Sequence, residues 1–281
     1  MPEPTPLYKY KITLEYDGTG YRGWQTQKNA RSVQGTLIEA AEKILGKKIE
    51  LQGAGRTDAG VHALAQVAHV ASPRKVNPGR LLQELNDLLP ASINVRNVET
   101  APRDFHARHH AKMRSYLYIV SRQRTAFGKR YVWWVKDKLD MKRMLTVIEL
   151  FRGFHDFASF ADKRRDKDVS TTVHLYATEL HECGDLLIFR ILGSHFLWKM
   201  VRRLVGITVE AGKGNLTAAE VKQMLTSFSE LPAQLTAPGS GLFLEQVLYE
   251  GDRQHPQELL PLPLLFSGFI PSSLSPLLPR G

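Results

Sequence analysis

The stretch from Leu7 to Asp17 alternates apolar and polar side chains with a period of two residues. Its apolar members are Tyr8, Tyr10, Ile12, Leu14 and Tyr16. This alternation predicts a strand that buries one face and keeps the other face polar. Strands of this kind are typical of antiparallel or mixed sheets with helices on one side, because all-parallel sheets bury both faces. The strand therefore favours an α+β fold.

Further one-sided strands and five helices follow, without a strict strand–helix repeat. The first helix is predicted to begin after the capping residue Ser32 and to end at Gly46. The second begins at Pro78, where a missing N–H is harmless, and ends before Pro90. The third helix is expected at about Asp140–Phe151, with Met144, Leu145 and Ile148 facing inward. Two more helices are expected at about Leu197–Ala211 and from Thr217, where a capping box begins. The remaining strands are expected at Gln66–Val70, Ile93–Thr100, Arg114–Ser121, Val173–His181, Leu186–Leu192 and Leu242–Tyr249. We expect an α+β fold with a mixed, mainly antiparallel sheet and helices on one face.

The segment 101–112 joins two halves that have a similar order of elements. We therefore expect an N-terminal α+β half over residues 1–105 and a C-terminal α+β half over residues 106–254. Residues 255–281 contain six prolines. Because such a density of proline breaks both helices and strands, we expect an extended or disordered tail there.

The charge balance points to a polyanionic partner. The 281 residues include 38 Lys and Arg against 28 Asp and Glu, which gives a formal net charge of +10. A single cysteine excludes a disulfide framework and a Cys-rich zinc site, and it fits a reducing compartment. The N-terminal residues show no signal peptide, and no apolar run reaches the ~18 residues of a membrane span. We expect a soluble, cytoplasmic protein.

The sharpest motif is the glycine-rich segment from Gly53 to His62. Asp58 stands where a dinucleotide-binding fingerprint needs its third glycine, and no Gly-Lys-Ser/Thr follows as in a phosphate-binding loop. The segment therefore presents the carboxylate of Asp58 close to the guanidinium of Arg56, and a nearby opposite charge keeps a carboxylate ionised. On composition alone, a solvated aspartate in a turn remains an open alternative.

The part of this motif from Gly55 to Ala63 resembles the catalytic motif of the tRNA pseudouridine synthase A family. Other blocks are similar to that family and follow its order, so the resemblance covers about residues 7–250 and is very specific. These blocks are Tyr16-Asp17-Gly18, Tyr21–Gln25, Ser32–Gly35, Asp104–Arg108, Arg114–Tyr118, Gly153–Phe157, Met200–Arg202 and Gly241–Leu244.

The resemblance implies an isomerase that converts uridine to pseudouridine in tRNA, on the 3′ side of the anticodon stem-loop at positions 38–40. It implies that Asp58 is the nucleophile, that Tyr116 lies against the target base, and that Arg56 and Arg202 serve the active site. It implies no cofactor and no metal. It also implies a homodimer in which one tRNA contacts both subunits, with the two halves of the chain forming a central RNA-binding cleft.

The residue types fit this chemistry. The reaction breaks the C–N bond between uracil and ribose and re-bonds C5 of the base to the same sugar carbon, so one ionised carboxylate suffices to attack or stabilise that carbon. The base must be flipped out of its stack, and Tyr116 can stack on it. We also expect substrate contacts from Thr57 and His62 in the motif, and phosphate contacts from the basic run Lys163, Arg164 and Arg165.

Several of these residues have a plainer structural interpretation. Tyr116 and Tyr118 share a strand face, so both could be core residues. Arg202 and Arg203 could lie on the solvated side of a helix, but the helix is so apolar that one of them is expected to point inward toward a carboxylate, for which Asp58 is the candidate.

Two other groups attract a functional interpretation as well. Trp24 and Tyr21 are better explained by packing than by RNA stacking. The histidines His106, His109 and His110 indicate a sheet-edge or RNA-facing role rather than a metal site, because no cysteine is near.

Two other functions remain open. A non-catalytic tRNA-binding or RNA-chaperone protein on the same fold would share the basic charge but not the need for Asp58. A hydrolase of small nucleosides or sugars could use Asp58, but it leaves the net charge of +10 unexplained.

Overall fold

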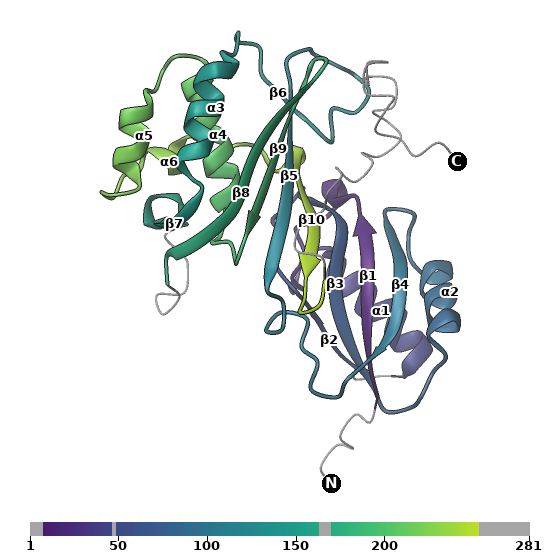
Figure 1. The fold of residues 1–281 in the computed structure, drawn as a ribbon. Helices are drawn as coiled ribbons and strands as arrows, with labels where there is room; N and C mark the ends of the chain where they lie inside the picture. Colours follow the sequence, from purple (N-terminus) through teal and green to yellow (C-terminus); the bar gives the residue numbers. More distant parts are fainter. Residues whose placement is uncertain (1–7, 47–48, 163–169, 253–281) are drawn as a thin grey trace, which may run out of the picture. The chain divides into compact units, whose positions relative to one another are not determined.

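The computed structural model describes residues 8–46, 49–162 and 170–252, which divide into two compact units. Of the described residues, those up to 112 and Phe243–Asp252 form the first unit, and those from 113 to 242 form the second. Each unit has its own strands and helices (Figure 1). The last strand, β10 (Leu242–Leu248), lies with the first unit, whereas the sequence placed it in the C-terminal half. β10 pairs parallel with a strand of the first unit, β3.

The sheet of the first unit has the order β4-β1-β3-β10, and β2 also pairs with β3. These strands, besides β10, are β1 (Tyr8–Tyr16), β2 (Glu50–Gly53), β3 (His62–Ser72) and β4 (Ile93–Ala101). β1 is antiparallel to β3 and β4, and β2 is antiparallel to β3, whereas β10 is parallel to β3 with Phe243 opposite His62. In β1, Tyr10, Ile12 and Leu14 are fully buried and their neighbours are partly exposed, which confirms the predicted alternation.

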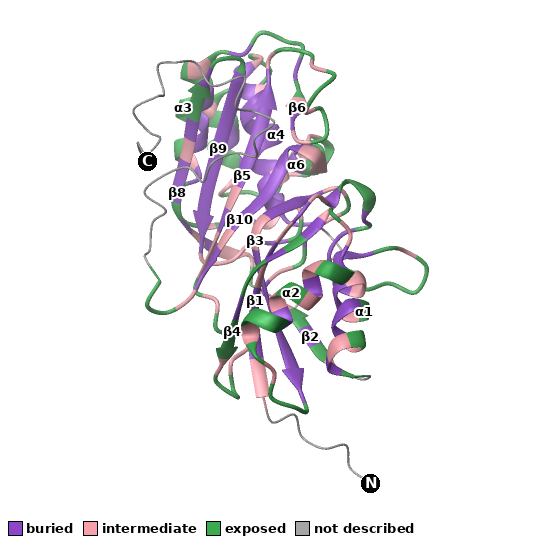
Figure 2. Ribbon diagram, turned by 90° about the vertical axis from the view of Figure 1, so that its right-hand side faces the viewer, coloured by how far each residue is buried: buried purple, intermediate pink, exposed green. Residues whose placement is uncertain are grey.

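Two helices, α1 (Val33–Leu45) and α2 (Pro78–Leu88), contact each other and pack against this sheet. Ser32 caps α1 by accepting a hydrogen bond from the Gly35 amide, and Gly46 ends the helix with a φ of 101°. Asn77 caps α2 in the same way, at the Arg80 amide. Figure 2 shows that both helices turn one face inward and one face to solvent, as their amphipathic sequences predict.

The sheet of the second unit has the order β5-β9-β8-β7 and is antiparallel throughout, while the short β6 pairs parallel with β5. Its strands are β5 (Met113–Ser121), β6 (Trp133–Trp134), β7 (Gly153–Asp156), β8 (Thr172–Cys183) and β9 (Leu186–Gly193). All eight residues of β9 are buried (Figure 2). β9 is therefore covered on both faces, and its sequence is correspondingly apolar on both sides.

The helices of the second unit are α3 (Met141–Leu150), α4 (Met200–Gly212), α5 (Ala218–Met224) and α6 (Leu231–Gln234). α3, α4 and α5 lie on the same side of β8 and β9 (Figure 1). α4 is the central helix and is buried along most of its length. In α3, Met144 and Ile148 are buried as predicted, but the expectation for Leu145 was wrong because it is 47% exposed. The buried stripe continues through Val147, three residues after Met144, and Leu145 falls to one side of it.

The structure confirms an α+β fold with a mostly antiparallel arrangement of strands, and the capping box from Thr217 to Glu220 is present at α5. The short elements β2, β6, β7 and α6 had not been predicted, because two to four residues carry little periodicity. The predicted basic run Lys163, Arg164 and Arg165 and the proline-rich residues 255–281 lie outside the described residues. Across the described ranges, none of the helices combines the length and apolarity that crossing a membrane requires.

Candidate active site

The loop between β2 and β3 carries Asp58, and backbone hydrogen bonds hold it against the segment that follows β1. The Trp24 amide donates to the Thr57 carbonyl at 3.0 Å, and the Gly60 amide donates to the Tyr21 carbonyl at 3.4 Å. At the start of the loop, the Ala54 amide donates to the Val67 carbonyl at 2.7 Å. The loop is therefore fixed from two directions, although its glycines make it intrinsically permissive.

Two glycines outside the loop allow this close approach. Gly23 has a φ of 97°, and a Cβ atom there would lie 2.5 Å from the Thr57 carbonyl oxygen. A Cβ atom on Gly18 would lie 2.0 Å from the Val61 carbonyl oxygen. Both contacts are with backbone atoms, which cannot rotate away. Gly18 and Gly23 thus let the two segments pack directly against each other.

Side chains from the same segment reinforce the loop. The Tyr16 hydroxyl lies 2.8 Å from the Thr57 hydroxyl in a buried hydrogen bond. The Trp24 ring packs on Gly53, where an added Cβ would meet it at 2.5 Å. Trp24 and Tyr21 are 1% and 4% exposed, which confirms the interpretation of both residues as packing. Thr57, which the sequence assigned to substrate contact, is itself buried by these neighbours.

At the end of the loop, His62 meets the turn that follows β1. Its Nδ1 lies 3.2 Å from Asp17 Oδ1 and 3.1 Å from the Gly18 amide nitrogen. The Thr19 amide and hydroxyl both donate to the same Asp17 oxygen. The hydrogen bond with His62 holds the pKa of the Asp17 carboxyl well below its usual range, with smaller contributions from Thr19. His62 is 1% exposed, and its ring stacks on Phe243 at 4.8 Å.

Asp58 is a partly exposed residue of this fixed loop. Its carbonyl accepts a hydrogen bond from the Val61 amide at 3.2 Å, which closes a turn over Ala59 and Gly60. Arg56, two residues earlier, is exposed, and Thr57 between them is buried. The loop therefore turns one neighbour inward and presents a carboxylate and a guanidinium at its surface.

In the second unit the structure distinguishes the two tyrosines of β5. Tyr118 is fully buried, and its hydroxyl donates to the Pro238 carbonyl at 2.8 Å. Burial raises the pKa of Tyr118 well above its usual range. Tyr116 is only half-buried, and its ring meets the edge of Phe196 at 4.9 Å. Tyr118 is thus a core residue, whereas Tyr116 keeps part of its side chain accessible.

Arg202 and Arg203 of α4 also differ. The Arg202 Nε donates to the Ala237 carbonyl at 2.7 Å, and the Ala237 amide donates back to the Arg202 carbonyl at 3.1 Å. Because Ala237 precedes Pro238, Arg202 is tied to the chain segment that receives the Tyr118 hydroxyl. Arg202 itself is half-buried. The sequence predicted one inward arginine in α4, with Asp58 as its candidate partner, without choosing between Arg202 and Arg203.

The arginine of α4 that points inward is Arg203. It is 5% exposed, donates to the Ala161 carbonyl and lies 3.8 Å from Asp162 Oδ2. Lys199 Nζ lies 2.8 Å from the same carboxylate oxygen. Asp162 is 5% exposed, and these two cations compensate the charge of its buried carboxylate.

The predicted histidine group lies against β3. His106 contacts the ring of the fully buried His69, at 4.7 Å, and also that of His109, at 4.1 Å. His69 Nδ1 accepts a hydrogen bond from the Ala107 amide at 3.1 Å, and burial lowers the pKa of His69 to about 4. Among the residues that the structure describes, no three His, Cys, Asp or Glu side chains gather as metal ligands.

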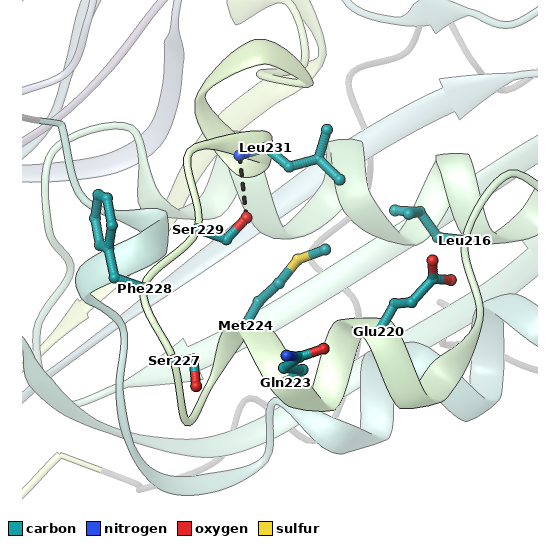
Figure 3. A pocket seen from close by; sticks show the side chains of 8 residues that line it. All are labelled: Leu216, Glu220, Gln223, Met224, Ser227, Phe228, Ser229 and Leu231. Atoms are coloured by element: carbon teal, nitrogen blue, oxygen red, sulfur yellow. Dashed lines mark hydrogen bonds between the residues drawn. The ribbon is translucent and has the colours of Figure 1, made fainter.

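A cavity of about 300 Å³ lies in the second unit beside α5 (Figure 3). Its walls include Met224, Phe228 and Leu231, and Glu220 is the one ionisable residue that the described structure places in them. The Glu220 carboxylate accepts from both the amide and the hydroxyl of Thr217, so it serves the helix cap. The cavity carries none of the predicted catalytic residues.

The structure therefore brings Arg56, Thr57, Asp58 and His62 together on one loop, and it places Tyr116 and Arg202 in the second unit. Sequence reasoning missed the residues that hold the loop, above all Tyr16, Asp17 and Phe243. Their presence in the motif blocks was a signal, since Tyr16 and Asp17 stand in one block and Phe243 in another. Their role was hidden because the contacts join segments that lie far apart along the chain.

Comparisons with known proteins agree with the motif blocks. A family model described as tRNA pseudouridine synthase matches residues 12–110 and 147–250. The tRNA pseudouridine synthase A of Thermodesulfovibrio yellowstonii is 39% identical over 254 residues, covering 86% of this chain and 100% of the relative. That of Rhodopseudomonas palustris is 40% identical over 246 residues, covering 86% and 99%.

A solved structure, the archaeal box H/ACA sRNP Nop10–Cbf5 complex, overlaps 71% of this chain and 44% of the matched chain. The identity is 11% and the TM-score is 0.34, which is too low to support an argument from fold.

Proposed function

The chain belongs to the tRNA pseudouridine synthase family and is an isomerase that makes pseudouridine in tRNA; from this premise, we propose that Asp58 is its nucleophile and that its targets are uridines in the anticodon stem-loop. The observation that carries the assignment of Asp58 is its position. It is the partly exposed carboxylate of a loop whose neighbours on both sides are held by hydrogen bonds. A group held in this way needs little reorganisation to reach a reactive geometry.

The chemistry requires one ionised carboxylate at the sugar. As the bond between N1 of uracil and C1′ of ribose breaks, C1′ becomes electron-poor, and Asp58 either attacks it or stabilises its charge. The detached uracil turns, C5 bonds to C1′, and the proton on C5 is lost while N1 gains one. Substrate and product are isomers, so no atoms are gained or lost overall. The exposed guanidinium of Arg56 lies on the same loop, two residues before Asp58.

Tyr116 is assigned to the flipped base. Its half-buried ring is supported by Phe196 and retains accessible surface, which a stacking partner requires. Tyr118 is unsuited to this role because it is fully buried and its hydroxyl is engaged by Pro238. Arg202 is assigned to the active site as well, since its Nε bond to Ala237 orients the guanidinium. Thr57 and His62 are assigned to the loop rather than to the tRNA, because both are buried.

The partner and the assembly follow from the family. We include in the proposal a homodimer that binds one tRNA across two subunits, action in the cytoplasm, and no cofactor. We also propose that residues 1–105 carry the catalytic loop. Residues 106–254 complete an RNA-binding cleft in this proposal. The net charge of +10 supports a polyanionic substrate.

The experiment is a comparison of Asp58→Ala and Asp58→Asn with the wild type on unmodified tRNA. Pseudouridine is mapped by chemical sequencing, and the affinity for tRNA is measured in parallel. We expect both variants to lose roughly 10³-fold or more in rate, with affinity nearly intact. Asp87→Ala, which removes an exposed carboxylate from α2 of the same unit, is the matched control and should keep full activity.

A wild type that binds tRNA but forms no pseudouridine in it would favour the non-catalytic binding protein instead. Activity on free uridine but not on tRNA would favour the small-substrate hydrolase.

A further inference from the structure

The Nδ1 atom of His62 lies between two groups of the turn that follows β1. Asp17 Oδ1 is 3.2 Å away and the Gly18 amide nitrogen is 3.1 Å away. One nitrogen cannot donate to the carboxylate and accept from the amide at the same time, because it carries either a proton or a lone pair. The Gly18 amide donates to Nδ1 when that nitrogen carries its lone pair, and Nδ1 donates to Asp17 when it carries the proton. In both arrangements the imidazole is hydrogen-bonded to the turn that follows β1.

Both partners of this pair are held in place by other groups. Asp17 Oδ1 accepts from the Thr19 amide at 2.9 Å and from the Thr19 hydroxyl. The His62 ring is 1% exposed and stacks on Phe243 with an interplanar angle of 27°. The imidazole therefore has little freedom to rotate away from Asp17, and a charge-assisted hydrogen bond in such surroundings is stronger than one at the surface.

The pair lies directly at the end of the catalytic loop. His62 is the first residue of β3, and the residue before it, Val61, packs its carbonyl against Gly18. The Val61 amide in turn donates to the Asp58 carbonyl at 3.2 Å. If His62 moved away from Asp17, Val61 would move with it, and the hydrogen bond from the Val61 amide would shift the backbone of Asp58.

We propose that Asp17 and His62 are positioning residues for the isomerisation, whose hydrogen bond fixes the C-terminal end of the loop and so aims the Asp58 carboxylate at the ribose. The proposal rests on the function proposed above. Neither residue touches substrate in it, because His62 is buried and Asp17 is engaged by Thr19 and His62. Their contribution is to geometry, where small misplacements of a reacting group have large effects on rate.

The experiment separates positioning from folding and from tRNA binding. Asp17→Asn, His62→Leu and His62→Asn are compared with the wild type in single-turnover rate, tRNA affinity and amide hydrogen exchange at residues 57–62. We expect Asp17→Asn and His62→Leu to lower the rate roughly 10- to 100-fold while tRNA affinity stays within about twofold. We expect faster exchange at Gly60 and Val61, and partial recovery of both rate and protection in His62→Asn, whose amide can reach the Nδ1 position.

Matched controls make the same chemical changes elsewhere. Asp140→Asn alters a carboxylate that caps α3, and His181→Asn alters a histidine 3.0 Å from Glu179 Oε2. Both should leave rate and exchange at residues 57–62 unchanged. The proposal is overturned if Asp17→Asn and His62→Leu keep the wild-type rate, if they leave loop exchange unaltered, or if rate and affinity fall in parallel. Failure of the proposed function would be seen separately, as a wild type that is inactive on tRNA. In that case hydrogen exchange at residues 57–62 would still show whether Asp17 and His62 hold the loop in place.

Discussion

The hydroxyl oxygens of Tyr16 and Thr57 lie 2.8 Å apart inside the first unit, although 41 residues separate them in the chain. Tyr16 ends β1, and Thr57 immediately precedes the proposed nucleophile. The end of one strand thus sets the position of the residue next to Asp58. This buried hydrogen bond acts by fixing the position of Thr57, and neither hydroxyl is assigned a part in the chemistry.

Removing both hydroxyls of this pair should cost less stability than the sum of the two single removals. Tyr16→Phe or Thr57→Val leaves a buried hydroxyl without its partner, and we expect each to lower the free energy of unfolding by about 1–2 kcal/mol. The double variant should be more stable than the sum of the single effects, with a coupling energy of about 1 kcal/mol. Urea unfolding of the four proteins measures this cycle, and strictly additive effects would contradict the bond.

Gly23→Ala should damage activity more than its size suggests. Alanine at this position would have to adopt a left-handed φ of 97°, and its Cβ would lie 2.5 Å from the Thr57 carbonyl oxygen. We expect a loss of roughly 1–3 kcal/mol in stability and a clear fall in turnover, because Thr57 adjoins Asp58. Gly20→Ala is the control, since a Cβ at Gly20 meets no atom within 4 Å. Equal behaviour of the two variants would show that the close approach is unimportant.

Stability should fall as the pH drops from about 6.5 toward 4. The pKa of the buried His69 is lowered to about 4, so within this window the unfolded chain binds a proton more readily than the folded one. Protonation would also oppose the bond from the Ala107 amide to His69 Nδ1. The slope contributed by one such group reaches about 1.4 kcal/mol per pH unit.

The measurement for His69 is the urea midpoint as a function of pH. His69→Gln should flatten the dependence between these limits, whereas His181→Gln, at an exposed position, should preserve it. A wild-type midpoint that stays constant down to pH 4 would contradict the assignment.

Substitutions of the two tyrosines of β5 should have different effects: one should lower stability and the other should lower turnover. Tyr118→Phe leaves the Pro238 carbonyl without its 2.8 Å donor and should lower stability by about 1 kcal/mol. Tyr116→Ala should lower turnover with little change in stability, since Tyr116 is half-buried. Tyr116→Phe tests whether its phenol moves the C5 proton: turnover close to wild type would restrict Tyr116 to stacking, whereas a loss comparable to that of Tyr116→Ala would support proton transfer.

Affinity for tRNA should fall steeply with salt. Contacts between phosphates and several Lys or Arg side chains release counterions, so the logarithm of affinity declines linearly with the logarithm of salt concentration. Titrations at salt concentrations between about 50 and 200 mM measure the slope. A flat response would exclude an interface dominated by phosphate contacts, and Asp58→Ala should leave the slope unchanged.

Local signals in the sequence predicted most of the secondary structure. Ser32 and the capping box at Thr217 located helix starts because a cap is satisfied within a few residues of itself. The alternation of β1 located its buried face for the same reason. Leu145 was assigned to the buried face in error. Successive residues of a helix point about 100° apart, so an assignment that is wrong by one residue moves a side chain from the buried stripe to its edge.

The surroundings of the site were less accessible to sequence reasoning. Asp58 and Arg56 were identified through their motif, but the bonds from Tyr16 and Asp17 that hold the loop depend on the register between β1 and β3. Likewise, the apolar sequence of α4 indicated one inward arginine without saying which. The structure selects Arg203, because Asp162 lies on its side of the helix. Such pairings are decided by tertiary packing, which single residues do not encode.

Strand β10 makes the first unit depend on a segment that follows the whole second unit in the sequence. Phe243, which carries the ring stacked on His62, lies about 130 residues beyond Lys112, where the continuous part of that unit ends. During synthesis at about 5–20 residues per second, the ribosome releases the whole Asp58 loop long before this support is available. The loop therefore gains the support of Phe243 only after the second unit has been synthesised. A nascent chain halted before Leu242 would carry every residue of the loop and still be inactive.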